Sequence, residues 1–568
     1  MSQDPHEEFV FVPLGGAGEF GMNLSLYGFE GKWLMVDLGI TFGDASTPGI
    51  DILMPDPAFI EERRDDLLAI VLTHAHEDHL GAVPYLWERL RCPVYATPFA
   101  AAILRRKLHE AGLENVVPVT VVRHGESVRL GPFDVTYIGV THSIPEGSSL
   151  LIRTSAGNVI HTGDWKLDPT PLLGKTTDEK RFAAAGDKGV LALICDSTNI
   201  FNPGDSGSEA AVRESLMEIV KDRPGRVAIT TFASNAARIA TVAAVAQARG
   251  RELAVVGRSL WRIIEAAKEC GYLGELPRLL TDEDAAFIPR DRLLLLCTGS
   301  QGEPRGAMNR IASHDHPYVS LEAGDTVIFS SKIIPGNERQ IGAMCNLLVQ
   351  DGIEVLTEKD HFVHVSGHPA RGEMKRLYGW VRPRIAVPVH GEVRHLTEHA
   401  AFAREQGVAE TVVVQNGAVL RLAPGPAAVL DHVPVGRLAL DGATLIPLDS
   451  ETIRTRKRLM HNGAVMITLV LDHDGNALAD PRVIVLGVSG GDGDGLAETL
   501  ERALRRTLAD MPRPRLRDSK EVELAARRAV NRHVRNVSGK RPVVKVQIVR
   551  VDAVAGAEEL PKGRAVAT

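Results

Sequence analysis

The sequence predicts a multidomain protein of mixed α/β and α+β class. Its 568 residues are too many for one hydrophobic core, and length alone suggests three or four domains. Strand-like runs separated by Gly-rich turns dominate the part before residue 200, whereas residues 206–257 alternate helix and strand as a parallel α/β unit does. Residues from 463 onward read as two strands, two helices and a last strand, which is a small α+β domain.

The predicted elements follow one another in a consistent order. Strands are expected in 9–16, 23–39, 68–76, 92–98, 133–143, 149–164 and 190–198, with helices in 80–90 and 98–112. Further strands are expected in 292–304 and 324–336, and the earlier strand-rich style resumes in 384–392 and 411–425. Residues 422–436, rich in Pro and Gly, are typical of a linker. We therefore expect a first domain in 1–207, an inserted α/β domain in 208–370, a return to the first domain in 371–430, a linker in 431–462 and an α+β domain in 463–568.

The composition excludes several classes of protein. Apolar residues make up 44% and charged residues 24%, which is ordinary for a globular protein. The five cysteines are scattered without a C-x-x-C pair, which argues against a disulfide framework or a thiolate zinc site and favours a reducing, cytoplasmic location. We see no signal-peptide pattern in MSQDPHEEFVFVPL and no charge-free apolar run of about 18 residues, so no membrane partner is expected.

Charge is unevenly distributed along the chain. The formal net charge is −7, yet residues 501–550 contain 15 Lys or Arg against 5 Asp or Glu. A solvated helix face explains this excess as well as a footprint for nucleic acid or an acidic partner does. Both interpretations stay open.

The glycine motif in GGAGEFG is not expected to bind a dinucleotide. Gly16 to Gly21 fit G-x-G-x-x-G after a strand, but a dinucleotide site needs a helix next, with its N-terminus facing the pyrophosphate. The following residues, MNLSLYGFEGKWLMVDLG, alternate like a hairpin instead.

Residues 73–81, THAHEDHLG, predict a metal site. Imidazole and carboxylate are ligands that borderline divalent metals accept. His74 and His76 lie just after a strand and can point into one metal, whereas Asp78 and His79 lie where a helix begins and can reach a second. A plain polar turn is a poor explanation, because adjacent buried imidazoles need partners.

Two metals need more ligands than this loop contains. His142 in VTHS, Asp164 in HTGD and His390 in VPVHGE each follow a predicted strand. Asp164 also follows a glycine, where its carboxylate could bridge both ions. Each signal is weak alone, but together with the loop they predict a two-metal centre.

These motifs resemble a known superfamily. H-x-H-x-D-H, the downstream histidine and the GD pair are similar to the metallo-β-lactamase superfamily, an αββα sandwich with its metal site at one edge. CDST, HVSGHP and PVHGE, which contain Asp196, His368 and His390, look like the three motifs of the β-CASP nucleases. GGAGEFGMN, TFASN, TGSQGEP and IPGNE resemble the ribonuclease J family in particular, in collinear order between about residues 9 and 430.

The resemblance implies an architecture and a set of ligands. The sandwich would carry an inserted β-CASP α/β domain and a small C-terminal α+β domain. One metal would be held by His74, His76, His142 and Asp164, and the other by Asp78, His79, Asp164 and His390. Asp37 is expected behind the ligands, orienting a loop histidine. Zinc is the expected ion, with Mn or Mg as alternatives.

The resemblance also implies a substrate. The segment His364, Val365, Ser366, Gly367 and His368 combines imidazoles, a hydroxyl and a glycine turn, which suit a phosphate. Ser234 and Asn235 would add donors, although an N-cap for the next helix explains them equally well. His368 paired with Asp196 could protonate the leaving oxygen or hold the phosphate. His390 matches RNA-directed members, since DNA-directed members have valine at that place.

The functional expectation is therefore a metal-dependent ribonuclease. The resemblance implies 5′-to-3′ exonuclease activity on single-stranded 5′-monophosphorylated RNA, added endonuclease activity, a role in RNA maturation and decay, and a homodimer or homotetramer. Alternatives are an RNA-binding scaffold with little activity, or a tRNA-processing or DNA-repair hydrolase on the same scaffold. A calcium site at Asp51 and Asp449 is also implied, but an exposed turn aspartate explains Asp51 at least as well.

Overall fold

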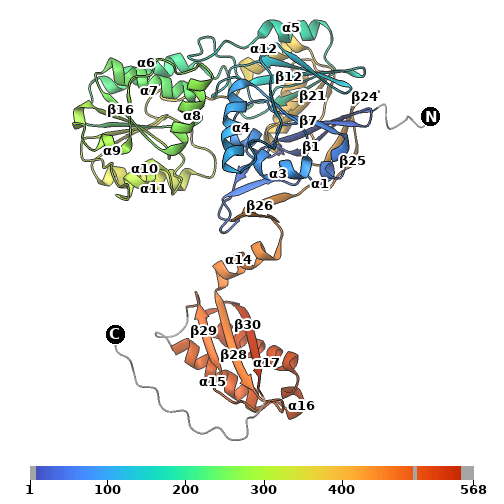
Figure 1. Ribbon diagram of the computed structural model, residues 1–568, viewed down its shortest axis with the longest axis vertical. Coiled ribbons are helices and arrows are strands. Elements are labelled where there is room, and N and C mark those ends of the chain that lie inside the picture. Colours follow the sequence, from blue (N-terminus) through green and yellow to red (C-terminus); the bar gives the residue numbers. More distant parts are fainter. Residues whose placement is uncertain (1–7, 490–494, 552–568) are drawn as a thin grey trace. The chain divides into compact units, whose positions relative to one another are not determined.

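The computed structural model describes residues 8–489 and 495–551, and Figure 1 labels their helices and strands. The first seven residues, part of the stretch used for the signal-peptide expectation, and residues 552–568, the end of the expected C-terminal domain, lie outside the described residues. The chain forms two compact units. One contains the residues up to Thr41 together with Ile52–Leu438, and the other contains Phe42–Asp51 together with the residues from Ala439. No described helix has the length and apolar character that crossing a membrane would need.

The core of the first unit is a pair of packed β-sheets. Aromatic and branched side chains from both sheets, such as Phe11, Tyr27, Val135 and Ile194, form one buried cluster between them. The first sheet has the order β25-β24-β1-β3-β4-β7-β8-β9 and the second has the order β10-β11-β12-β13-β14-β21-β23. The strands of the first sheet are β1 (Phe9–Gly15), β3 (Leu24–Phe29), β4 (Lys32–Val36), β7 (Leu67–Val71), β8 (Val94–Ala96), β9 (Val119–Val121), β24 (Ala418–Ala423) and β25 (Ala428–His432). Those of the second are β10 (Ser127–Leu130), β11 (Phe133–Gly139), β12 (Ser148–Thr154), β13 (Gly157–His161), β14 (Ala192–Asp196), β21 (Ile385–Val389) and β23 (Glu410–Thr411).

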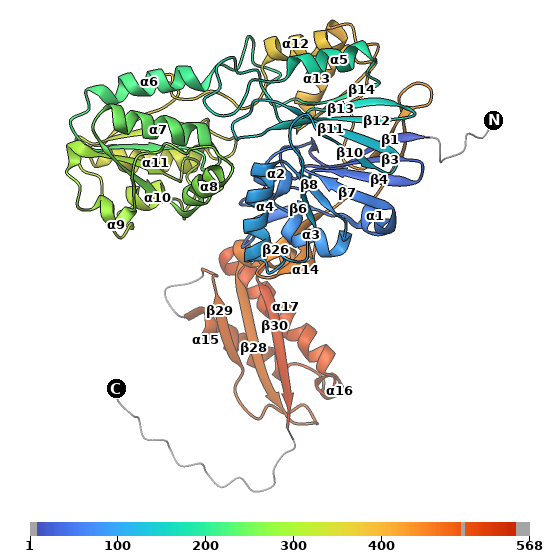
Figure 2. The same cartoon turned by 45° about the horizontal axis from the view of Figure 1, so that its top comes forward.

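Helices cover the outer faces of both sheets. On the first sheet these are α1 (Ala58–Glu61), α2 (Glu77–Leu80), α3 (Val83–Leu90) and α4 (Pro98–Glu110) (Figure 2). On the second they are α5 (Glu179–Asp187), α12 (Arg371–Val381) and α13 (Val393–Glu405), whose Phe182, Leu377 and Phe402 pack on the outward side of that sheet. The predicted αββα sandwich is confirmed.

The glycine-rich start of the chain leads into strands. The two residues of β2 (Ala17–Gly18) pair with β22 (Gly391–Glu392), and β3 and β4 form an antiparallel hairpin. No helix follows the G-x-G-x-x-G motif, as expected. Two short strands come later, β5 (Thr41–Phe42) and β6 (Ile52–Pro55).

An inserted domain separates two neighbouring strands of the second sheet. The chain leaves the sandwich after β14 and returns in β21, and these strands pair in parallel with Asp196 opposite Val389. The insert has a six-stranded parallel sheet of order β17-β16-β18-β15-β19-β20. Helices α6 and α7 lie on one face and α10 and α11 on the other (Figure 1). Its strands are β15 (Val227–Thr230), β16 (Glu252–Val256), β17 (Leu279–Leu280), β18 (Leu293–Cys297), β19 (Thr326–Phe329) and β20 (Glu354–Leu356), and its helices are α6 (Glu209–Lys221), α7 (Ala236–Ala248), α8 (Arg258–Glu269), α9 (Asp282–Ala285), α10 (Ala307–Ala312) and α11 (Glu338–Gln350).

The expected linker contains regular structure, which corrects the sequence interpretation. β25 lies within the Pro- and Gly-rich segment, and the residues after it form β26 (Arg437–Asp441), β27 (Thr444–Pro447) and α14 (Glu451–Asn462). The prolines and glycines lie in the turns between these elements, as Gly425 does with φ +81°. The composition therefore indicated the turns correctly and missed the short strands.

The C-terminal part of the second unit is a three-stranded sheet covered on one face by helices (Figure 2). β28 (Ala464–Leu471) is central, with β29 (Arg482–Leu486) antiparallel and β30 (Val543–Arg550) parallel to it. The helices are α15 (Gly495–Ala509), α16 (Arg513–Leu516) and α17 (Ser519–Ser538). Leucines spaced four apart on α15 and valines and alanine spaced four apart on α17 pack on the sheet. The expected α+β domain is confirmed, and arginines of both helices lie on their exposed faces, which fits either explanation of the basic charge.

Candidate metal centre

The histidine loop follows β7 and is held in place by Asp37. Asp37 comes directly after β4, the neighbour of β7, in a left-handed backbone conformation with φ +63°. Its carboxylate accepts the backbone N–H of Thr73 at 2.8 Å and Nδ1–H of His79 at 2.7 Å. The side chain is 1% exposed. Asp37 therefore orients the loop from behind, at the position where the sequence placed it.

Parallel strand ends explain why distant residues meet here. His74 follows β7, Asp164 follows β13, Asp196 ends β14 and His390 follows β21. The carboxyl ends of neighbouring parallel strands lie at one edge of a sheet, so side chains just beyond them converge. His142 joins them from the loop after β11.

Three imidazoles and a carboxylate form the first cluster of potential ligands. His76 Nδ1 lies 3.0 Å from Nε2 of His74 and 3.0 Å from Nε2 of His142. Asp164 Oδ2 is 3.7 Å from each of the latter two nitrogens. One donor atom from each of the four residues falls within 4.8 Å of the others.

A second cluster shares Asp164 with the first. His79 Nε2 lies 3.2 Å from Asp164 Oδ2, and His390 Nε2 lies 3.2 Å from Asp78 Oδ2. One donor atom from each of Asp78, His79, Asp164 and His390 again lies within 4.8 Å of the others. The structure thus brings together all seven side chains that the sequence proposed as ligands.

Hydrogen bonds on the outer side of each ring determine which nitrogen faces inward. His142 Nδ1 donates to the carbonyl of Gly367 at 2.6 Å, so its Nε2 carries a lone pair. His74 Nδ1 lies 3.0 Å from Thr73 Oγ1, which gives its own hydrogen to Asp37 and can therefore accept. Two inward lone pairs facing one another across His76 are unfavourable unless a cation lies between them. This donor set fits a divalent metal ion.

The charges of the two clusters agree with that fit. Burial lowers the pKa of His76 to about 4 and also holds the pKa values of His74 and His142 well below normal, so these ligands stay neutral. Burial opposes ionisation of Asp164, but His390 and His79 hold its pKa well below its usual value. The Oδ1 atom of Asp164 is buried without a hydrogen-bond partner among the described residues. A shared, ionised carboxylate with an unused oxygen suits a bridge between two ions.

Asp196, His368 and Thr198 form a third group beside the clusters. His368 Nδ1 donates to Asp196 Oδ2 at 2.8 Å, and its ring stacks on that of His390 at 5.5 Å. Burial opposes a charge on His368, yet Asp196 and Asp164 raise its pKa. Thr198 Oγ1 donates to Asp196 at 2.7 Å and lies 2.8 Å from His390 Nδ1, which orients that ligand.

The segment from His364 to His368 lies against the first cluster. Gly367 has its Cα so close to His142 that a Cβ would lie 2.9 Å from that ring, so only glycine fits. Ser366 Oγ accepts Asn199 Nδ2 at 2.7 Å and the backbone N–H of His368 at 3.1 Å, so its own hydrogen remains available. His364 Nδ1 is buried with no hydrogen-bond partner in the described part of the chain. Val365 is buried beside them.

Asn235 has a different position from the one expected for a phosphate donor. Its side chain caps α7 by accepting the N–H of Arg238 at 2.9 Å, and its amide donates to Glu209 at 3.2 Å. It is 2% exposed. The N-cap explanation therefore accounts for Asn235, whereas Ser234 is partly exposed at the start of the same helix.

Sequence reasoning missed a buried ionic network that supports this segment. Arg238, fully buried, pairs with Glu209 at 3.1 Å and donates to the carbonyl of Val363 at 2.9 Å. Glu373 accepts the backbone N–H groups of Leu167, at 2.8 Å, and Ala370, at 2.7 Å. These contacts hold together the two segments in which the chain passes from the sandwich into the insert and back. No local pattern in the sequence indicates them.

The expected calcium ligands Asp51 and Asp449 lie outside the clusters of potential metal ligands found among the described residues. Both residues are exposed. We do not propose a calcium site.

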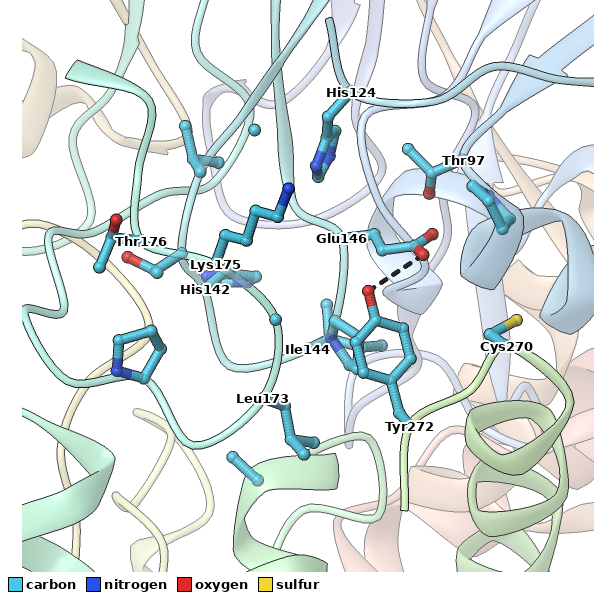
Figure 3. Close-up of a pocket in the computed structure, with 18 of the residues that line it drawn as sticks. Thr97, His124, His142, Ile144, Glu146, Leu173, Lys175, Thr176, Cys270 and Tyr272 are labelled. Carbon is cyan, nitrogen blue, oxygen red and sulfur yellow. Dashed lines mark hydrogen bonds between the residues drawn. The ribbon is translucent and has the colours of Figure 1, made fainter. Parts of the chain in front are cut away.

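A cavity of about 1080 Å³ borders the metal centre (Figure 3). His142 and the loop after it form part of its wall, together with Tyr272 from the insert and Lys175 from the sandwich. Its carboxylates are already engaged, as Asp178 is with Arg181 at 2.9 Å.

Comparisons with known families match nearly the whole chain. The profile "Ribonuclease J, beta-CASP domain" matches residues 224–348 and "Ribonuclease J C-terminal domain" matches 451–551. "Metallo-beta-lactamase superfamily" matches 17–230, and "Zn-dependent metallo-hydrolase RNA specificity domain" matches 352–414.

Individual relatives are similar along their full length. Ribonuclease J of Sinorhizobium meliloti is 45% identical over 557 residues, which cover 97% of this chain and 98% of the relative. Ribonuclease J of Mycolicibacterium smegmatis is 37% identical over 546 residues, covering 95% and 96%. A crystal structure of a protein of unknown function from Enterococcus faecalis V583 aligns with a TM-score of 0.51 at 16% identity, over 74% of this chain and 100% of that one, which shows a similar fold.

Proposed function

The chain belongs to the ribonuclease J family, and we propose that it degrades RNA with a two-metal centre, 5′ to 3′ from monophosphorylated ends and also endonucleolytically. It is a metal-dependent hydrolase that acts on RNA, as a member of this family. The observation that carries the finer proposal is the pair of His and Asp clusters that share Asp164. We propose RNA maturation and decay as its role.

The seven ligands would hold the ions in two sets, His74, His76, His142 and Asp164, and Asp78, His79, Asp164 and His390. When bound, two divalent ions supply an activated water as nucleophile and stabilise charge on the phosphate. Nitrogen and oxygen donors without thiolate favour zinc, with Mn or Mg as alternatives.

His368 and Asp196 would act on the substrate beside the metals. Burial opposes a charge on His368, but Asp196 and Asp164 raise its pKa and so favour the protonated imidazole, in which Nδ1 donates to Asp196 and Nε2 carries the second hydrogen. From that nitrogen it can donate a proton to the leaving 3′ oxygen or a hydrogen bond to the phosphate. Burial opposes ionisation of Asp196, but His368 lowers the pKa of this carboxyl. The ionised Asp196 in turn stabilises a positive charge on His368.

The 5′ phosphate would bind at His364, Val365, Ser366 and Gly367. Support comes from the hydroxyl hydrogen of Ser366, which is available to donate, and from the buried His364 Nδ1, which has no hydrogen-bond partner among the residues that the structure describes. Arg238 and Lys332 lower the pKa of His364, after burial, and their positive charges also favour a phosphate nearby. Ser234 stays in the proposed pocket, and Asn235 does not.

The C-terminal domain would serve association into a dimer or tetramer. On the sheet face opposite its helices, Met466, Ile484 and Leu486 are 47%, 58% and 50% exposed. An open apolar sheet face of this kind suits pairing about a two-fold axis. The five free cysteines support our proposal of a cytoplasmic location.

One experiment tests the function directly. The purified protein is assayed for bound metal, and end-labelled single-stranded RNAs with 5′-hydroxyl, monophosphate or triphosphate ends are then incubated with it, with and without a chelator. We expect metal-dependent release of mononucleotides, fastest from the monophosphate. Binding of RNA without cleavage would favour the scaffold alternative.

A further inference from the structure

The loop that carries His142 is attached to the insert at a second point. Glu146 lies four residues after His142, and its carboxylate accepts two hydrogen bonds. Oε2 accepts the backbone N–H of Phe99 at 2.7 Å, and Oε1 accepts the hydroxyl of Tyr272 at 3.1 Å (Figure 3). Glu146 therefore connects its own loop to two other parts of the unit.

The two donors come from opposite sides of the boundary between sandwich and insert. Phe99 lies in the first turn of α4 in the sandwich, whereas Tyr272 follows α8 in the insert. The two rings also meet edge to face, with centroids 6.5 Å apart. Arg106 of α4 pairs with Glu269 of α8 at 2.8 Å beside them. Glu146 therefore accepts one hydrogen bond from the sandwich, from Phe99, and one from the insert, from Tyr272.

The backbone of Glu146 shows that the loop is held under constraint. Its φ of +61° lies in the left-handed region, which residues other than glycine rarely adopt. The neighbouring Gly147 is also tightly packed, because a Cβ at this position would lie 3.2 Å from His142 Cβ. A conformation of this kind persists only where neighbouring contacts enforce it. The two hydrogen bonds to the Glu146 carboxylate are such contacts.

We propose that Glu146 and Tyr272 are a positioning pair that fixes the orientation of His142. Through this pair, the position of the insert against the sandwich affects the geometry of the metal centre. The proposal rests on the proposed metal-dependent function of that centre. Neither residue belongs to the ligand clusters. His142 is thus connected to the insert twice, through its ring to the Gly367 carbonyl and through its loop to Tyr272.

The hydroxyl of Tyr272 is suited to this role. Burial and the charge of Glu146 raise its pKa, so it remains a donor at neutral pH. Tyr272→Phe removes this one hydrogen bond and keeps the ring on Phe99. Glu146→Gln keeps the shape of the side chain and removes its charge.

A matched control exists within the insert. Tyr318 is also a tyrosine of the insert, is 45% exposed, and does not belong to the clusters of potential metal ligands. Tyr318→Phe therefore removes a tyrosine hydroxyl from the insert without altering the boundary with the sandwich.

The experiment uses the full-length protein loaded with Co²⁺, whose visible absorption reports ligand geometry. For the wild type and the three variants we would record the spectrum, metal loss to a competing chelator, kcat and KM on 5′-monophosphorylated RNA, and Tm. We expect Tyr272→Phe and Glu146→Gln to change the spectrum, to release metal faster, and to lower kcat by about 5- to 10-fold with KM within about twofold. Tyr318→Phe should match the wild type.

Two results would overturn the proposal. One is an unchanged spectrum and unchanged metal release in Tyr272→Phe, whatever happens to Tm, because a merely structural bond would affect stability alone. The other is an equal spectral change in Tyr318→Phe. A wild-type protein that binds Co²⁺ without cleaving RNA would contradict the proposed function instead, and the spectra would still test the pair. If Glu146→Gln does not fold, Tyr272→Phe decides.

Discussion

Replacing Ser366 with alanine should weaken the preference for 5′-monophosphorylated over 5′-hydroxyl RNA by about 10- to 150-fold, because a hydrogen bond to a charged group contributes about 1.5–3 kcal/mol. The structure supports this choice of residue. Ser366 Oγ accepts from Asn199 and from the backbone of His368, so its hydrogen is free to donate to a phosphate.

Internal cleavage should change little in the same variant, since Ser366 is not among the potential metal ligands. The assay compares initial rates on end-labelled linear RNAs that differ only in their 5′ group, and on a circular RNA that has no end. Ser313→Ala, at an exposed serine after α10 of the insert, is the control and should behave like the wild type. A Ser366→Ala protein that keeps the full preference for monophosphate would refute the pocket.

The other predictions concern the metals, pH and assembly. Asp164→Asn should lower RNA hydrolysis by several orders of magnitude and reduce bound metal while circular dichroism stays native, and near-normal rates in a metal-free variant would contradict the two-metal proposal. The pKa of His399, buried between Ser197 and Tyr378, is lowered to about 4 by burial, so between about pH 6.5 and 4 the unfolded chain binds a proton that the folded protein does not. Stability should therefore fall on acidification by about 1.4 kcal/mol per pH unit from this group, and His399→Gln should show a correspondingly smaller loss of stability in urea unfolding between pH 7 and 5. A chain that ends at residue 462 should keep its metals but form particles with fewer subunits, as measured by light scattering. An unchanged number of subunits would refute association through the C-terminal sheet.

The ligand set could be predicted from sequence because metal binding limits the residue types so strongly. Imidazoles and carboxylates that follow apolar strands have few structural uses there, and six of the seven lie within the H-x-H-x-D-H motif or beside a glycine. The order of strands then places them at one edge, as the pairing of β14 with β21 shows for Asp196 and His390. The αββα sandwich was predicted differently, from the resemblance of these motifs to the metallo-β-lactamase superfamily.

The supporting network could not be predicted in the same way. Arg238, Glu209 and Glu373 resemble ordinary charged residues of helices, and only the folded structure shows that they are buried. Their partners are separated by up to 206 residues, as for Glu373 and Leu167. A charge can be buried only when such partners are present, and their identity depends on tertiary structure. Asn235 illustrates the converse, because its local role as an N-cap was visible in the sequence beside the functional one.

Backbone conformation adds a constraint that motifs do not reveal. Asp37, Glu146 and His390 all have positive φ without being glycine, and all three lie at or beside the metal centre. Each is held by contacts from elsewhere, as His390 is by its N–H to the carbonyl of Gly16 at 2.7 Å. β14 and β21 pair across the whole insert that separates them in the sequence, and the loop closure that this pairing needs is entropically costly. The geometry of the centre therefore depends on the insert as well as on the strands that carry the ligands.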